Sequence, residues 1–562
     1  MRKITFIVLF ASVYFLFAEN DSIPAKNGMV VSASNLASQV GIEIMRAGGN
    51  AIDAAVATGF ALAVTYPQAG NIGGGGFLVA HLADGRNITL DFRETAPLAA
   101  HRDMYLDETG EVIKDMSIRT HRAVAVPGSV AGLLTAWRYY GSGSISIKQL
   151  VKPAIKLANG GFKITERFAN SLNNNQPLFL KDDSARRVFT RSDGKNWQAG
   201  DLLIQKDLSK TLQRIVKNDL NGFYLGKTAE LIVAEMESGN GLITLRDLEL
   251  YSPKLREPII GNYKNFDIVS MGPPSSGGIL LVQMLNMLSN FKLDTLIFNS
   301  ADYIHLLTEI ERLAYADRAE HLGDSDYWKV PITMLIDKQY AADRAHKISM
   351  HKAARSTDVF AGEIPKYECR ETTHYSVTDK AGNAVSVTTT LNTFFGTGIL
   401  VDGAGFFLNN EMDDFSAKPG SPNIFGLIGS TANAIQPYKR PLSSMTPTII
   451  LCNKKPYIII GSPGGSTIIT TVLQVILNII EHNMDVQDAV AAPRFHCQWL
   501  PDAIFLEPNT LTTDIKSQLE SRGHSILPYK WGYIGQANGI QIIDGLFIGG
   551  ADPRDENSAI GY

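Results

Sequence analysis

The segment between residues 372 and 392 constrains the fold of this chain most, because its pattern predicts a β-hairpin with two different faces. Residues 374–378 and 384–390 are rich in β-branched residues, and the loop between them contains Gly382, which can adopt a positive φ. A three-residue loop makes the pairing symmetric about Ala381 and sets Thr372 opposite Thr390. Side chains alternate along a strand, so polar and apolar groups separate. The polar face then carries Thr372, His374, Ser376, Ser386, Thr388, Thr390 and Asn392, and the apolar face carries Tyr375, Val377, Val385 and Val387.

Thr372 is the candidate nucleophile of this hairpin. A threonine hydroxyl needs a base beside it, and its own α-amino group can serve if the chain is cut between Glu371 and Thr372. Such an amine titrates at roughly 7.7 to 8.0, so a useful fraction is unprotonated near neutral pH. Thr390 is placed to hold the amine by a hydrogen bond. Taken alone, however, a threonine-rich hairpin is typical of an ordinary half-buried ribbon.

Motifs elsewhere in the chain decide between these interpretations. Downstream of Thr372 they occupy residues 391–393, 396–398, 408–416, 440–445 and 461–466. Upstream they occupy residues 48–55, 73–76, 91–97, 125–129 and 273–277. In this order and at these intervals they resemble the γ-glutamyltransferases, also called γ-glutamyltranspeptidases or glutathione hydrolases. The resemblance covers nearly the whole chain.

The resemblance implies an α+β fold, the four-layer α-β-β-α sandwich of the N-terminal nucleophile hydrolases. Two subunits cut from one self-processing precursor form this fold jointly and stay associated as a heterodimer. The large subunit would span residues 19–371, and the small catalytic subunit would span residues 372–562.

Residues 1–18 are predicted to be a signal peptide, because basic residues precede an apolar stretch that ends at Ala18. The protein is therefore expected to be exported to the periplasm or secreted. Leu16 is bulky for its place before the cut, which leaves open a shifted cleavage site or a retained anchor. No later apolar run reaches the ~18 residues that span a bilayer.

The implied reaction is cleavage of the γ-glutamyl bond of glutathione and related compounds. Thr372 forms a γ-glutamyl ester, and water or an amino acid resolves it. The backbone N–H groups of Gly464 and Gly465 would stabilise the oxyanion. A γ-glutamyl group also presents an α-carboxylate and an α-ammonium, which need opposite charges. The implied carboxylate ligands are Arg93, Ser443 and Ser444, and the implied ammonium ligands are Asn392, Glu411 and Asp414.

Two positions depart from some bacterial members of the family. Glu411 replaces a glutamine, so the ammonium pocket should be more negative. In the predicted lid, residues 422–426, Phe425 replaces a tyrosine, so a hydroxyl hydrogen bond is missing and weaker closure is expected. His374 shares the face of the nucleophile, but the amine makes a histidine base unnecessary, so a structural role is favoured.

Two alternatives stay open at this point. One is an acylase of the same superfamily that acts on a glutaryl-type (cephalosporin) side chain, which lacks the α-ammonium. Glu411 and Asp414 argue against it. The other is a non-catalytic surface binding protein that keeps the fold and remains a single uncut chain.

Composition narrows the choice of partners. The chain has 562 residues, 45% of them hydrophobic and 19% charged, and no linker or repeat divides it, which indicates one large body. A net charge of −4 gives no reason to expect nucleic acid or an anionic membrane. Cys369, Cys452 and Cys497 are too few and too scattered for a disulfide framework or a zinc site. A small-molecule substrate, without a metal or organic cofactor, is expected.

Periodicity predicts the main elements. Helices are expected at residues 34–46, 52–64, 129–140, 147–159, 301–322 and 467–481, and further strands at residues 77–82, 87–92, 405–408, 446–451 and 457–461. The glycine run at residues 73–76 lacks the Gly-Lys-Ser/Thr ending of a phosphate-binding loop, so it is interpreted as a site of close backbone packing.

Overall fold

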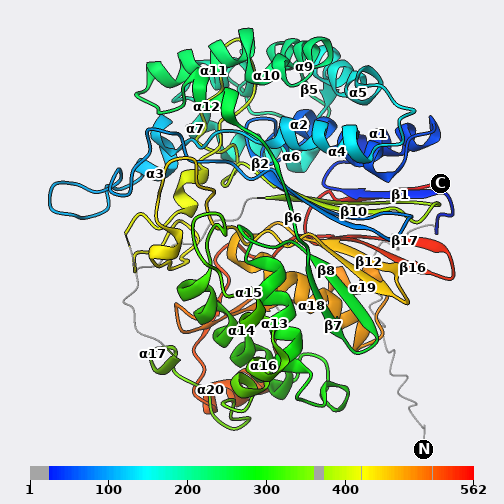
Figure 1. The fold of residues 1–562 in the computed structure, drawn as a ribbon, viewed down its shortest axis with the longest axis vertical. Coiled ribbons are helices and arrows are strands. Elements are labelled where there is room, and N and C mark those ends of the chain that lie inside the picture. Colours follow the sequence, from blue (N-terminus) through cyan, green and yellow to red (C-terminus); the bar gives the residue numbers. More distant parts are fainter. Residues whose placement is uncertain (1–23, 360–371, 419, 509) are drawn as a thin grey trace, which may run out of the picture.

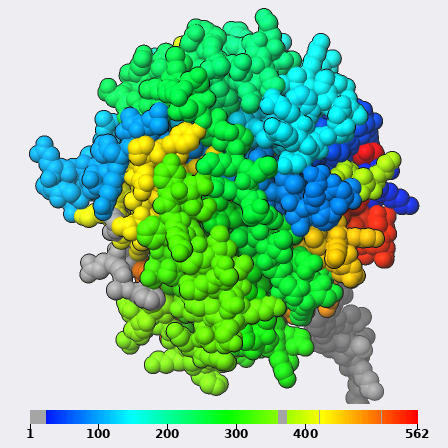
Figure 2. All heavy atoms as spheres, in the orientation of Figure 1, coloured from blue at the N-terminus to red at the C-terminus, as the bar shows by residue number. Residues whose placement is uncertain are grey.

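A computed structural model of the protein describes residues 24–359, 372–418, 420–508 and 510–562. The predicted signal peptide, Cys369 and Glu371 lie outside these residues. Figure 1 shows two β-sheets stacked face to face, with one layer of helices above them and one below. In the space-filling view of Figure 2, side chains close the space between the layers on this face of the molecule. The predicted four-layer α-β-β-α sandwich is confirmed.

The first sheet has seven strands and contains the hairpin at its centre. Every neighbouring pair in it is antiparallel. In spatial order its strands are β18 (Ser558–Gly561), β1 (Gly28–Ser32), β9 (Thr373–Asp379), β10 (Ala384–Thr390), β2 (Gly75–His81), β3 (Asn87–Asp91) and β6 (Lys254–Arg256).

The second sheet has six strands, and its neighbours are also antiparallel. In spatial order they are β17 (Leu546–Ala551), β16 (Asn538–Ile543), β12 (Lys455–Gly461), β11 (Thr448–Cys452), β8 (Phe266–Ser270) and β7 (Ile259–Tyr263). Two minor sheets consist of β13 (Phe495–His496), β14 (Ile504–Leu506) and β15 (Ile526–Pro528), and of β4 (Phe162–Lys163) and β5 (Leu202–Leu203).

Long helices cover the outer face of each sheet. The first sheet is covered by α1 (Asn35–Arg46), α2 (Ala51–Thr65) and α4 (Ser129–Tyr140), with α5 (Ile147–Gly160) packed on α2. The second sheet is covered by α13 (Gly277–Leu288) and α18 (Ile468–Ile480), with α14 (Ala301–His321) packed on α13. The remaining α-helices are α3 (Met116–Arg119), α6 (Glu166–Asn174), α7 (Gln176–Phe179), α8 (Asp183–Phe189), α9 (Lys206–Asn218), α10 (Asn221–Tyr224), α11 (Gly226–Ser238), α12 (Leu245–Leu250), α15 (Ile332–Leu335), α16 (Lys338–Ala345), α17 (Ser356–Val359), α19 (Val486–Ala491) and α20 (Thr513–Ser521). None of the described helices is long and apolar enough to cross a membrane.

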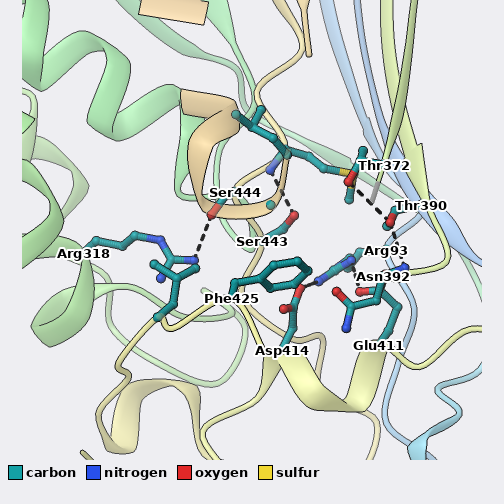
Figure 3. Close-up of a pocket in the computed structure, with 14 residues that line it drawn as sticks. Arg93, Arg318, Thr372, Thr390, Asn392, Glu411, Asp414, Phe425, Ser443 and Ser444 are labelled. Atoms are coloured by element: carbon teal, nitrogen blue, oxygen red, sulfur yellow. Dashed lines mark hydrogen bonds and ion pairs between the residues drawn. The ribbon is translucent and has the colours of Figure 1, made fainter. Parts of the chain in front are cut away.

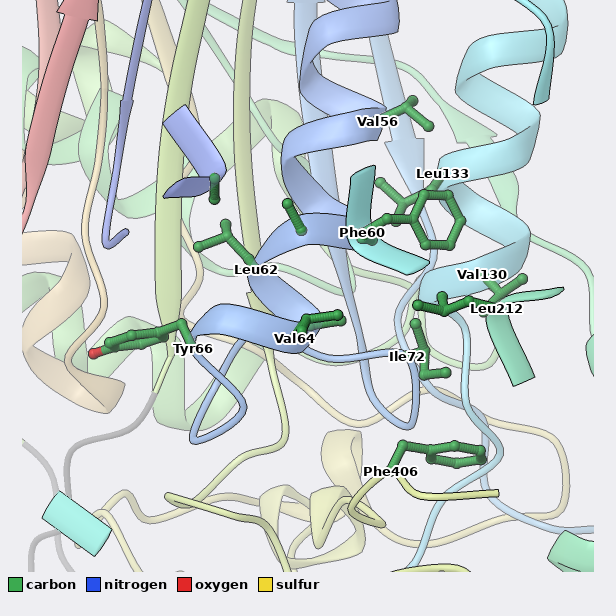
Figure 4. Close-up of a cluster of buried hydrophobic side chains, with 14 of the residues drawn as sticks. Val56, Phe60, Leu62, Val64, Tyr66, Ile72, Val130, Leu133, Leu212 and Phe406 are labelled. Atoms are coloured by element: carbon green, nitrogen blue, oxygen red, sulfur yellow. The ribbon is translucent and has the colours of Figure 1, made fainter. Parts of the chain in front are cut away.

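Alternation along the strands separates the core into three interfaces. In β2, Phe77 and Val79 pack between the two sheets, while Leu78 and Ala80 face the helices above. In β12, Ile459 lies between the sheets, whereas Ile458 and Ile460 face the helices below. Figure 4 shows the upper interface, where Phe60 and Leu62 of α2 lie among side chains from several other elements. Both faces of the central strands are therefore buried.

The hairpin has the predicted register. Thr373 pairs with Thr389 and Thr378 pairs with Ala384, and the loop glycine, Gly382, has a φ of 95°. Its apolar face packs on the helix layer. Its polar face is buried against the second sheet, where Ser376 Oγ donates to Asn538 O at 3.1 Å and Ser386 Oγ donates to Ile460 O at 3.0 Å. The hydroxyls are thus buried hydrogen-bonding groups between two sheets.

Most predicted elements agree with the structure to within two residues at either end, and α4 matches its prediction fully. The prediction of a strand at residues 405–408 is wrong. Gly405 has a φ of 78° and lies against Asp207 of α9, and Phe407 forms only an isolated bridge with Leu400. A buried turn and an edge strand share the same apolar composition, which explains the error.

The glycine run at residues 73–76 provides close backbone packing, as predicted. A Cβ atom on Gly76 would collide with Thr388 O and lie 2.8 Å from Thr389 Cα, and a Cβ atom on Gly74 would collide with Thr390 O. Glycine at these positions lets β2 approach β10, the strand that carries Thr390.

Replacing Gly76 by alanine should therefore destabilise the fold. We expect Gly76→Ala to lower the free energy of unfolding by about 1–3 kcal/mol or more, because the new methyl group meets backbone that cannot move aside. Chemical denaturation measures the change. The control is Gly160→Ala, since a Cβ atom there meets nothing within 4 Å. Equal stability of the two variants would contradict the packing role of Gly76.

Candidate active site

A small cavity of about 20 Å³, lined mostly by buried side chains, lies where the start of β9, the loop after β10 and the N-terminal end of α18 meet. Figure 3 shows its side chains converging from both halves of the sandwich. It is lined by Arg93, Arg318, Thr372, Thr390, Asn392, Glu411, Asp414, Phe425, Leu427, Ser443, Ser444, Met445, Gly465 and Ile468. The structure thus brings together every predicted site residue except Gly464, which precedes a lining residue, and Glu371, which lies outside the described residues.

Thr372 and Thr390 face each other at one end of the cavity. Their Oγ1 atoms are 3.5 Å apart, and only 5% of Thr372 and 3% of Thr390 are exposed. Thr390 Oγ1 accepts a hydrogen bond of 2.8 Å from the backbone N–H of Asn392. Asn392 has a φ of 72°, a left-handed conformation, and its side chain donates to Asn410 O at 3.0 Å. The predicted pairing therefore places both hydroxyls on the cavity wall.

Arg93 forms the charged centre of the cavity. Its guanidinium makes ion pairs with Glu411 and Asp414, and Glu94 lies 3.6 Å away. Burial opposes the charge of Arg93, but the attraction of Glu411, Asp414 and Glu94 outweighs it, so the pKa of Arg93 is raised. Burial raises the pKa of Glu411 well above its usual range and that of Glu94 to about 7. One cation thus shares a desolvated site with three carboxyl groups.

This excess of acidic groups has a chemical consequence. An anionic ligand group would compete with Glu411 and Asp414 for Arg93, and a cationic group would be attracted to the carboxylates. A ligand that carries both charges satisfies both requirements. The cavity is therefore complementary to a zwitterionic head group.

Two serines form the wall opposite Glu411. Ser443 Oγ accepts from Met445 N at 3.2 Å, and Ser444 Oγ accepts from Arg318 at 3.2 Å. Since both oxygens already accept, each hydroxyl proton remains available for an anionic ligand. Arg318 was not predicted from sequence.

Gly464 and Gly465 form the turn between β12 and α18. Their φ values are 138° and 56°, which favour glycine in both positions. A Cβ atom on Gly465 would lie 2.5 Å from the Phe425 ring. Gly465 therefore fits between the lid and α18 only because it has no side chain.

The loop at residues 422–426 closes over the cavity without a tyrosine hydroxyl. Asn423 Nδ2 donates to Asp414 Oδ1 at 3.0 Å, and Ile424 N donates to Asp413 Oδ2 at 2.9 Å. Phe425 is buried and packs against Gly465. Burial raises the pKa of Asp413 to about 7. Carboxyl groups of the 3-10 helix Glu411–Asp414 therefore hold the loop in place.

His374 lies outside the cavity lining and serves the hairpin instead. Its Nδ1 and Nε2 atoms hydrogen-bond to Thr388 Oγ1 at 2.9 Å and Ser376 Oγ at 3.0 Å. Burial lowers its pKa to about 3, so the ring is neutral at physiological pH. These contacts support the structural role that was favoured from sequence.

Arg318, Leu427, Met445 and Ile468 are the lining residues that sequence reasoning missed. Arg318 occupies an ordinary position in a long helix, and its serine partner lies 126 residues further along the chain. The three apolar residues have the composition of any core segment. No local pattern distinguishes these four from their neighbours.

One group within the described residues has the spacing of metal ligands. Single ligand atoms of His305, Glu309 and His524 lie within 4.8 Å of one another. The two histidines already share a 2.7 Å hydrogen bond, and Arg312 lies 3.4 Å from Glu309. The positive charge of Arg312 opposes a bound cation, and none of these residues lines the cavity.

Two antiparallel sheets between helical layers, with a threonine at the start of a central strand that lines a buried cavity, define the class of N-terminal nucleophile hydrolases. The chain belongs to the γ-glutamyltranspeptidase family, whose model matches residues 37–562.

Individual relatives agree with this assignment. The chain is 46% identical to the glutathione hydrolase proenzyme of Escherichia coli (strain K12), over 96% of this chain and 93% of that protein. A chain of the Helicobacter pylori γ-glutamyltranspeptidase structure is 45% identical, with a TM-score of 0.57, and the match covers 59% of this chain and 94% of that chain. The cephalosporin acylase structure from Bacillus halodurans is 25% identical, with a TM-score of 0.84 and 99% coverage of both chains.

The neutral, buried His374 should make stability depend on pH. Its folded pKa of about 3 lies below the ordinary value of 6.5, so between these limits the unfolded chain binds a proton that the folded chain does not. Stability is therefore lost as pH falls from 6.5 toward 3. We expect His374→Gln to reduce this slope by about 1.4 kcal/mol per pH unit, measured by denaturant unfolding between pH 4 and 6.

The same replacement at exposed His346 is the control. A slope that is unchanged in His374→Gln would rule out the buried neutral imidazole as its source. Retained hydrolytic activity at neutral pH in His374→Gln would further support a structural role.

Proposed function

We propose that the chain is a self-processing γ-glutamyl hydrolase and transferase that cleaves glutathione and related γ-glutamyl compounds. The observation that carries this proposal is the cavity in which Thr372 lies beside a buried arginine and an excess of carboxyl groups. Thr372 supplies a nucleophile, and the arginine and the carboxyl groups match the two charges of a glutamyl head group. The named activity of the Escherichia coli relative agrees with this chemistry.

Processing would divide the chain between Glu371 and Thr372. In our proposal Thr372 Oγ1 attacks the carbonyl carbon of Glu371, and the peptide C–N bond breaks, which leaves an ester and frees the α-amino group of Thr372. Water then hydrolyses the ester, releasing the carboxylate of Glu371 and restoring the Thr372 hydroxyl. The large subunit would end at residue 371, and the small subunit would span residues 372–562. The word proenzyme in the relative's name supports this step, as does the Helicobacter pylori chain, whose match covers 59% of this one.

In turnover the new amine would act as the base. Thr372 Oγ1 attacks the γ-carbonyl carbon of the donor, the amine accepts the hydroxyl proton and passes it to the leaving amine, and a γ-glutamyl ester remains. Thr390 would orient the amine. The backbone N–H groups of Gly464 and Gly465 would stabilise the oxyanion, with Gly465 nearer the cavity. Water or an amino acid then resolves the ester.

Recognition would exchange internal ion pairs for pairs with the substrate. The α-carboxylate would take the place of Glu411 and Asp414 on Arg93 and accept from Ser443 and Ser444. Those two acids, with Asn392, would then hold the α-ammonium. A glutaryl group lacks the ammonium and would leave buried carboxylates without a cation, which favours γ-glutamyl over glutaryl donors.

Export is the last part of this proposal. Residues 1–18 would direct the chain to the periplasm or out of the cell and then be removed. Sequencing the N-terminus of the purified protein would identify this cut together with the one before Thr372.

Removing the nucleophile should abolish processing and turnover together. We expect Thr372→Ala to remain one chain on a denaturing gel and to hydrolyse γ-glutamyl para-nitroanilide at least about 10⁴-fold more slowly than wild type. Thr372→Ser should retain both reactions because it keeps a hydroxyl. The matched control is Thr373→Val, whose side chain does not line the cavity. If the Thr372→Ala variant were still cut into two chains and still active, Thr372 would be excluded as the nucleophile.

Asp414 should discriminate between the two classes of donor. We expect Asp414→Asn to lower kcat/KM for γ-glutamyl para-nitroanilide by roughly 10- to 100-fold, because a charged hydrogen bond to the ammonium is lost. Glutaryl para-nitroanilide has no ammonium, so its hydrolysis should change far less. Equal losses on both donors would refute the assigned contact, and faster wild-type turnover of the glutaryl donor would favour the acylase alternative.

A further inference from the structure

Arg318 of α14 differs from every other deeply buried arginine among the described residues. The others each form an ion pair with a carboxylate, as seen for Arg93, Arg312, Arg344, Arg440, Arg494 and Arg554. Only 4% of Arg318 is exposed, and its side chain donates to two serine hydroxyls instead. An unpaired buried charge is costly unless another group compensates it. Asp414 attracts Arg318 from beyond ion-pair distance, and the place of Arg318 on the wall of the cavity indicates that a ligand supplies further compensation.

The contacts of Arg318 reach both serines of the cavity wall. Its Nη2 donates to Ser444 Oγ at 3.2 Å, a contact visible in Figure 3. Its Nε donates to Ser276 Oγ at 3.0 Å, and that hydroxyl donates to Ser443 O at 2.7 Å. The backbone N–H of Ser276 donates to the same carbonyl at 2.8 Å. One guanidinium thus fixes the side chain of one serine and, through Ser276, the backbone of the other.

The direction of these hydrogen bonds matters for binding. Arginine can only donate, so Ser444 Oγ must accept from Arg318, and its own proton must point to a different acceptor. Ser443 Oγ likewise accepts a hydrogen bond from Met445 N, which orients its hydroxyl group. Each hydroxyl therefore keeps a proton that it can donate to a ligand. An anionic oxygen is the ligand atom that such a wall selects.

We propose that Arg318 is a positioning residue for the α-carboxylate of the donor: it orients Ser443 and Ser444 as hydrogen-bond donors and adds a second positive charge behind Ser444. This inference rests on the proposed γ-glutamyl hydrolase function. Arg93 would bind the carboxylate directly, while Arg318 acts through the serines. Its effect should therefore follow the carboxylate of the donor and not its ammonium.

Three para-nitroanilide donors test this role in the full-length, processed enzyme. The γ-glutamyl donor carries both charges, the glutaryl donor carries the carboxylate alone, and the γ-aminobutyryl donor carries the ammonium alone. For Arg318→Gln we expect KM to rise roughly 10- to 100-fold with the first two donors and to change little with the third, with a smaller effect on kcat. Arg318→Lys should recover part of the loss, because it restores the charge without the forked geometry.

A double-mutant cycle separates positioning from a general loss of structure. If Arg318 acts through Ser444, the variant carrying both Arg318→Gln and Ser444→Ala should lose little more than the more severe single variant. Arg344→Gln is the matched control, because Arg344 of α16 is a buried arginine that pairs with Asp317 of α14 but does not line the cavity. It should lower thermal stability without distinguishing among the donors.

The outcomes also separate this inference from the function on which it rests. Suppose that wild type hydrolyses the γ-glutamyl donor. If Arg318→Gln then raises KM equally for all three donors, or if the effects of Arg318→Gln and Ser444→Ala multiply in the double variant, the positioning role is wrong and the function stands. If processed wild type does not hydrolyse the γ-glutamyl donor at all, the proposed function itself fails. Self-cleavage of Arg318→Gln, seen as two bands on a denaturing gel, indicates that the variant has folded.

Discussion

The rest of the structure depends on the buried polar face of the central hairpin. Polar groups removed from water must find partners, and here His374 bonds to Thr388 while Ser376 and Ser386 bond to backbone carbonyls of the second sheet. A slip of one residue would turn these groups into the helix layer and the apolar groups into the hydrogen-bonded interface. The register is therefore strongly specified, and it sets Thr372 beside Thr390 at the cavity.

The ion pairs in the cavity also depend on packing between residues far apart in the sequence. Arg93 follows β3 of the first sheet, whereas Glu411 and Asp414 belong to a 3-10 helix more than 300 residues later. Removing one partner from a buried ion pair typically costs about 3–5 kcal/mol. Loss of one member of the Arg93 cluster should consequently destabilise the fold, and the cluster also marks the place where a charged ligand can bind.

How far the sequence predicts this arrangement depends on the range of the interactions. The hairpin register followed from local alternation and one loop glycine, and the long helices followed from their periodicity. The segment at residues 405–408 was predicted wrongly because its conformation depends on packing against α9, which local composition does not reveal. Arg318 was missed for the same reason, since its partners Ser276 and Ser444 lie on other elements. The close Thr388–Gly76 approach, by contrast, was visible as a run of glycines.

Asp414 connects recognition with closure of the cavity. One of its oxygens pairs with Arg93, and the other accepts from Asn423 of the loop that covers the site. If the proposed α-ammonium takes over the pairing with Asp414, the carboxylate can keep its bond to Asn423 while releasing Arg93 for the α-carboxylate. A ligand with a carboxylate alone would displace Asp414 from Arg93 without offering it a cation, leaving a buried charge next to the loop. Selectivity for a zwitterion and retention of the closed loop would then have one electrostatic origin, and Phe425 would need no hydroxyl for either.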